Sequence, residues 1–138
     1  MSPRKREYTP EFILRFAANY SNQRSTIVLT LFEARPLAEL REALDRFRSL
    51  RYMDAIRTLT DKIISRQVSP DYYHMALCYI ARSYARLGDI QSAEIIAGEL
   101  DKVPIPASYT STANSLREDV KKDIDTCRSK LAHAGSAS

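Results

Sequence analysis

The sequence is poor in glycine and lacks any long apolar run. Only three of its 138 residues are glycine, and none is tryptophan. So few glycines leave no loop that could wrap a phosphate and few turns with positive φ, which weighs against dinucleotide-binding folds and β-hairpins. The longest apolar run, around residues 27–32, is far too short to span a bilayer. We therefore expect no membrane span, and no apolar secretory signal at the start.

Cysteine and histidine are equally scarce, with two of each. We expect Cys78 and Cys127 to be buried free thiols in a cytosol-like compartment, with one disulfide as the alternative. Cys78 follows His74 by one helical turn, and such a pair could bind a metal or form a thiolate. Two ligands do not complete a zinc site, so we favour a packing role. We expect no metal, no cofactor and no catalytic residue, and hence no enzyme.

Acidic residues are under-represented in the first half of the chain. The net charge is +4; residues 1–60 hold eleven Lys and Arg against seven Asp and Glu, whereas residues 61–138 hold ten of each. An acidic protein partner is therefore plausible for the N-terminal half. We expect a cytoplasmic protein, with a mitochondrial presequence as the alternative because the first twenty-five residues are rich in arginine and serine.

The residues that are abundant favour a soluble helical domain. Hydrophobic residues make up 44% of the chain and charged residues 28%, which is typical of a globular protein. Residues 9–11, threonine, proline and glutamate, form a helix-start signal. Gly88 is placed to end a helix in the left-handed conformation. The β-branched stretch 25–34 has no partner strand, so we expect a short helix there.

An apolar stripe marks the last helix. It recurs every three or four residues, as expected for a helix that covers one end of a larger core. We expect a basic N-terminal segment with an amphipathic helix over residues 1–24, a helical domain over 25–133 and a flexible tail over 134–138. The stripe consists of Leu116, Val120, Ile124, Cys127 and Leu131.

Two stretches of the chain align with each other at an offset of 38 residues. "REALDRFRSLRYMDAIRTL" and "LCYIARSYARLGDIQSAEII" place Leu50 on Gly88 and Ala55 on Ala93. The second stretch resembles a tetratricopeptide repeat, and the resemblance extends over residues 36–106. It implies an all-α, right-handed stack of antiparallel helix pairs with flanking capping helices. The residues that carry it are Leu77, Ile80, Ala81, Tyr84, Leu87, Gly88, Ala93 and Leu100.

The resemblance also implies a function in protein–protein contact. Tetratricopeptide units bind proteins, so we expect an adaptor or chaperone-like subunit of a larger assembly, as a homo- or hetero-oligomer. Arg82 and Arg86 lie one turn apart; they could clamp a carboxylate in a groove, or snorkel from a packed helix. The groove candidates are Tyr73, Leu77, Arg82, Tyr84 and Arg86.

The N-terminal stretch "KREYTPEFILRFA" suggests a different function. It resembles the docking motif by which the scaffold subunit of the cap-binding initiation complex grips the cap-binding translation initiation factor. Tyr8 takes the tyrosine place of that motif, Leu14 the second hydrophobic place and Phe16 the trailing aromatic place, whereas Ile13 stands where leucine is preferred. The resemblance implies a translation regulator that docks a helix in a groove, and its contact residues would be Tyr8, Phe12, Ile13, Leu14 and Phe16.

Two further interpretations of this stretch stay open. Phe12, Phe16 and Tyr20 form a stripe that could anchor the helix on the first repeat as an N-terminal cap. Alternatively, the segment could contact nucleic acid with strong salt dependence, although denser basic clusters with aromatic platforms would then be expected. The basic residues concerned are Arg4, Lys5, Arg6, Arg15 and Arg24.

Overall fold

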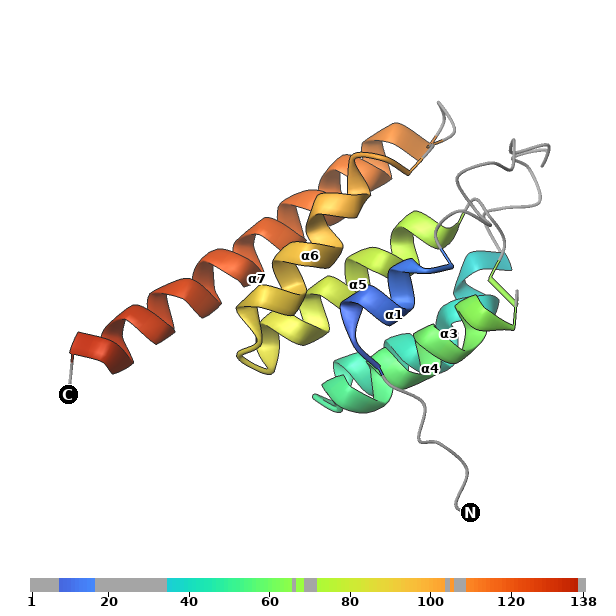
Figure 1. Cartoon of the computed structure of the whole chain (residues 1–138). Coiled ribbons are helices and arrows are strands. Elements are labelled where there is room, and N and C mark those ends of the chain that lie inside the picture. Colours follow the sequence, from blue (N-terminus) through green and yellow to red (C-terminus); the bar gives the residue numbers. More distant parts are fainter. Residues whose placement is uncertain are drawn as a thin grey trace, which may run out of the picture.

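All regular structure in the part of the chain that the structure describes is helical. The computed structural model describes residues 8–16, 35–65, 67–68, 72–103, 105 and 109–136. The predicted all-α class is confirmed for these residues. The basic run before Tyr8, the rest of the N-terminal stripe and the expected helix at 25–34 lie outside them. The helices are α1 (Pro10–Leu14), α3 (Arg35–Arg48), α4 (Tyr52–Ile64), α5 (Tyr73–Arg86), α6 (Ile90–Leu100) and α7 (Thr110–Ser136) (Figure 1).

The helices form antiparallel pairs around a central helix. α3 and α4 make one pair and α5 and α6 the next, and each pair is joined by a short turn (Figure 1). α5 packs against α3 and α4 and also against α6 and α7. Ala81 and Ala93, one on each helix of the second pair, are fully buried, as expected where two helices approach closely. α5 therefore forms the middle of the core.

The two turns within the pairs have the same geometry at the offset of 38 residues. Leu50 has a φ of 64° and Gly88 a φ of 86°. After the first, the N–H of Arg51 donates to the carbonyl of Arg46 at 2.9 Å; after the second, the N–H of Asp89 donates to the carbonyl of Tyr84 at 2.9 Å. This bond and a left-handed residue define the Schellman end of a helix. The prediction that Gly88 ends its helix is confirmed.

Helix α1 begins as predicted but is short. The Thr9 hydroxyl accepts a hydrogen bond from the N–H of Phe12 at 3.2 Å, and Pro10 opens the first turn. The helix ends at Leu14, so Phe12 and Phe16 do not form one stripe of a longer helix; their rings meet edge to face at 5.6 Å. α1 packs against α6 and α4 rather than on the first helix pair alone.

Helix α7 is the longest element and extends beyond its neighbours. In Figure 1 its C-terminal end projects past the turn between α5 and α6. The helix continues to Ser136, so the tail that we expect from residue 134 begins within this helix. The predicted stripe is buried from Leu116 to Cys127, but its last member, Leu131, is 48% exposed. Within the described part of the chain, no helix is long and apolar enough to cross a membrane.

Candidate protein-binding site

The N-terminal residues proposed as a docking motif are held by the rest of the chain. The Tyr8 hydroxyl donates to Asp61 Oδ1 on α4 at 3.1 Å, and the Arg57 guanidinium lies 5.8 Å from the centre of the Tyr8 ring. The Tyr84 hydroxyl, from α5, donates to the backbone carbonyl of Tyr8. Tyr8, just before α1, is therefore fixed to two helices of the main body.

Ile13 is the main apolar anchor of α1. Its side chain is fully buried in the core, whereas Leu14 and Phe16 are only partly buried against the core and Phe12 is partly exposed. The anchor therefore differs from the aromatic stripe that the sequence suggested. Because Tyr8 and Ile13 face the chain's own core, docking of this helix on another protein would require α1 to leave its place.

Three of the five residues proposed for a groove lie in the core. Tyr73 is 1% exposed, Leu77 is not exposed and Tyr84 is 4% exposed. They do not line an open groove, because α5 is surrounded by α3, α4, α6 and α7. The other two candidates, Arg82 and Arg86, lie on the side of α5 that faces α7.

Arg82 and Arg86 clamp a carboxylate that belongs to the chain itself. Arg82 Nε donates to Asp123 Oδ2 at 2.8 Å, and Arg86 Nε donates to the same oxygen at 3.2 Å. A weaker ion pair joins Arg82 to Asp119 at 3.9 Å. The side chains of Arg82 and Asp123 are both only 15% exposed, so this contact is shielded from solvent more than a surface ion pair. It fixes α7 to α5.

Aromatic rings hold the two arginines from the other side. The Arg82 guanidinium carbon lies 4.8 Å, and that of Arg86 5.1 Å, from the centre of the Phe47 ring. Arg86 also donates from Nη1 to the Tyr52 hydroxyl at 3.2 Å, and this bond and those to Asp123 raise the pKa of the Arg86 guanidinium. Arg86 is thus held on an aromatic face, in a fixed orientation and fully charged.

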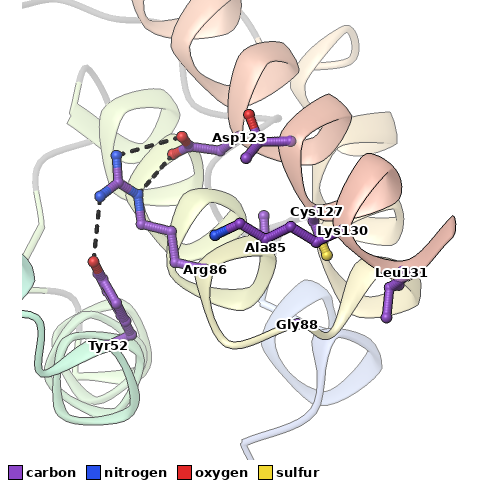
Figure 2. A pocket seen from close by; sticks show the side chains of 9 residues that line it. Tyr52, Ala85, Arg86, Gly88, Asp123, Cys127, Lys130 and Leu131 are labelled. Atoms are coloured by element: carbon purple, nitrogen blue, oxygen red, sulfur yellow. Dashed lines mark hydrogen bonds and ion pairs between the residues drawn. The ribbon is translucent and has the colours of Figure 1, made fainter. Parts of the chain in front are cut away.

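A pocket of about 450 Å³ opens beside Arg86. Figure 2 shows Tyr52 and Arg86 on one side of it and the residues from α7 on the other, with the Lys130 nitrogen directed toward Arg86. The pocket lining contains two cations, Arg86 and Lys130, and one anion, Asp123. Asp123 also pairs with Arg82, so the net charge around the pocket is positive. The residues on which the argument depends are Tyr52, Ala85, Arg86, Asp123, Lys130 and Leu131.

The His74–Cys78 pair forms a buried polar cluster with Arg117. Arg117 Nε donates to His74 Nε2 at 3.3 Å, and Cys78 Sγ lies 3.7 Å from His74 Nδ1. Because Nε2 accepts, the neutral ring carries its proton on Nδ1, toward the sulfur. Arg117 also donates to the Leu100 carbonyl at 3.0 Å, so the cluster joins α5, α6 and α7.

The surroundings of this cluster keep both the His74 ring and the Cys78 thiol in their neutral forms near pH 7. Burial, with the charge of Arg117, lowers the pKa of His74 to about 4, and burial raises the pKa of Cys78 to about 12. The thiol therefore stays protonated near neutral pH and is a poor nucleophile. Cys78 and Cys127 are both buried and unbonded, as predicted. Among the described residues, no group of three His, Cys, Asp or Glu side chains is placed to hold a metal ion.

Sequence reasoning missed Asp123, Tyr52 and Lys130. A signal for Asp123 was present: Arg82 and Arg86 are four residues apart on α5, and Asp119 and Asp123 have the same spacing on α7. Two helices that pack side by side can match such pairs turn by turn. Comparison of the chain with protein-family models, with curated proteins and with solved structures finds no match. The site is therefore argued from its own geometry.

Proposed function

We propose that this chain is a non-enzymatic protein-binding module, an adaptor or chaperone-like subunit of a larger assembly. One observation supports this most directly. The apolar stripe of α7 is covered from Leu116 to Cys127 and continues into Leu131, which is 48% exposed beside the pocket. An apolar side chain that continues a buried stripe past the end of its cover, beside a pocket, offers a surface on which another protein can pack.

The arrangement of the helices agrees with a tetratricopeptide-like stack, which we include in the proposal. The turn geometry recurs after 38 residues, small residues are buried where the paired helices meet, and α7 covers one end of α5. The buried, protonated Cys78 also favours action by contact over nucleophilic catalysis. The clamp on Asp123 keeps α7 in place as a rigid support for its exposed end.

A reconstituted complex tests the proposal. A protein that co-purifies with the tagged chain from its own cells is identified, produced separately and mixed with the purified chain. We expect a complex of defined stoichiometry in sedimentation. Leu131→Asp should weaken it at least about tenfold, whereas Ile95→Asp, at a site on α6 that is 40% exposed, should not. The absence of a complex between the purified components would contradict the proposal, whereas a complex that survives Leu131→Asp would place the contact away from the end of α7.

A further inference from the structure

The last turns of α7 present a basic and an apolar side chain side by side. Lys130 and Leu131 both line the pocket, and residues 128–133 are all exposed. Within the described part of the chain Lys130 forms no ion pair, whereas its neighbour Arg128 pairs with Glu94 at 2.6 Å. Lys130 is therefore a cation held over a pocket without a counter-charge of its own.

The exposed apolar side chain continues a covered helical stripe. Leu131 follows the buried Cys127 by four residues on α7, about 6 Å along the axis, which is the spacing that side chains one turn apart on a neighbouring helix can match. The earlier part of the same stripe is already covered by α5 and α6. A helix from another protein, laid against the end of α7, would continue this cover where α5 ends.

The charge of the pocket defines the chemistry of that helix. Arg86 uses three of the five donors of a guanidinium on Asp123 and Tyr52, so the others remain available to a ligand. Arg86 and Lys130 together exceed the single carboxylate of Asp123. A second copy of the chain docked in the same way would bring Lys130 toward Lys130 and Arg86, which is repulsive. A carboxylate between these two cations is favourable, and charge-assisted bonds to it would be partly shielded by the walls.

We propose that the end of α7 and this pocket bind an acidic amphipathic helix of a partner protein. The partner's Asp or Glu side chain lies between Arg86 and Lys130, and an apolar side chain one turn away packs on Leu131 and Ala85. This rests on the proposed function, that the chain binds proteins, and goes beyond it by assigning the site and the chemistry of the partner.

Selection from a phage-displayed peptide library tests this proposal with the full chain as the target. Each peptide is an amphipathic helix of about 20 residues, randomised at the positions on its binding face. We expect the enriched peptides to carry an acidic residue one turn from a large apolar one. Their affinity should fall about tenfold in Lys130→Glu and about fivefold in Leu131→Ala. Lys121→Glu provides the matched control, since Lys121 is also exposed on α7 but lies outside the pocket. Its affinity should stay within about twofold.

A charge swap completes the test. A peptide whose acidic residue is changed to lysine should lose binding to the wild-type chain and regain it on Lys130→Glu. Enriched peptides without acidic residues, equal binding to wild-type and Lys130→Glu chains, or the absence of any enriched peptide would each overturn the inference. The proposed function is judged separately, by the reconstituted complex, which uses no peptide. Lys130→Glu and Leu131→Ala alter exposed side chains, so the thermal unfolding of these two variants should match that of the wild type.

Discussion

Leu50 and Gly88 occupy equivalent positions with unequal side chains. Both have positive φ at the end of a helix, but only glycine adopts this conformation without steric cost. Leu50 is 68% exposed, so its side chain contributes little packing. Leu50→Gly should therefore raise the free energy of unfolding by about 0.5–1 kcal/mol, because relief of the strain exceeds the entropic cost of glycine.

Gly88→Ala is the matched control, and urea unfolding of both variants is the measurement. A Cβ at Gly88 would meet no atom within 4 Å, so any loss reflects the backbone conformation alone. We expect a loss of about 1 kcal/mol. If Leu50→Gly destabilised the chain, the left-handed turn at Leu50 would not be as described.

His74 should make the stability of the fold depend on pH in a defined window. Its pKa is about 4 in the folded chain, lowered by burial and by Arg117, against 6.5 for an ordinary histidine. Above pH 6.5 the ring is neutral in both the folded and the unfolded chain. As the pH falls from 6.5 to about 4, only the unfolded chain gains the proton, so stability is lost, by on the order of 3 kcal/mol.

The measurement is urea unfolding of the wild type and of His74→Gln at several values between about pH 7.5 and about pH 4, which covers the titration of His74 in the unfolded chain. The amide can still accept from Arg117 but does not titrate there, so the wild-type slope should exceed that of the variant. The acidic groups are common to both chains, and their effect cancels in the difference. Equal slopes would mean that His74 is not buried beside Arg117.

At the scale of elements, Asp123 is the link between α5 and α7. Asp123→Asn should cost about 2 kcal/mol of stability, because Arg82 then lies partly buried without its main counter-charge. Asp125→Asn is the control on the same helix, since Asp125 is 59% exposed and lies 4.0 Å from Arg128. Its effect should stay within about 0.5 kcal/mol. Similar thermal shifts in the two variants would contradict the clamp.

Helix α1 should unfold together with the rest of the chain. Ile13→Ala removes a fully buried side chain and should cost about 2–4 kcal/mol, whereas Arg15→Ala, at an exposed site, should change little. Denaturant unfolding of the two variants measures this. A cost below about 0.5 kcal/mol for Ile13→Ala would mean that α1 contributes nothing to the core, and would favour its release to a partner.

The sequence predicted elements better than contacts, for a physical reason. The helix start at Thr9 and the helix stop at Gly88 are local signals in the sequence, and both agree with the structure. The burial of Ile13 instead of the Phe12 stripe was not predictable in this way, because it depends on where α4 and α6 lie. Asp123 likewise meets Arg86 across 37 residues of sequence.

The same distinction applies to the candidate site. Arg82 and Arg86 were identified from their spacing, but the sequence left open whether they bind a ligand or pack. The two arginines bind Asp123 of the same chain. The groups that a ligand in the pocket can reach are therefore Lys130 and the N–H donors of Arg86 that Asp123 and Tyr52 do not use. Tyr73, Leu77 and Tyr84 are buried instead. An apolar stripe does not show which neighbours cover a helix, and in the described part of the chain α5 packs against α3, α4, α6 and α7.

At the scale of the whole molecule, the described helices form one packed body, and we propose that a partner binds at the exposed end of α7. α1 and α4 to α6 are packed and cross-linked by polar contacts, whereas residues 128–133 are exposed. A partner that binds as proposed should therefore leave the body unchanged and cover this end alone.

Amide hydrogen exchange on the chain, alone and in the reconstituted complex, tests this most directly. Peptides covering residues 126–136 should exchange more slowly in the complex, because a helix docked there stabilises the last turns of α7 against opening. Exchange in α1 and α4 should stay the same. If exchange slowed in α1 and stayed unchanged at the end of α7, the result would contradict the proposed site. It would place the partner at the N-terminal segment.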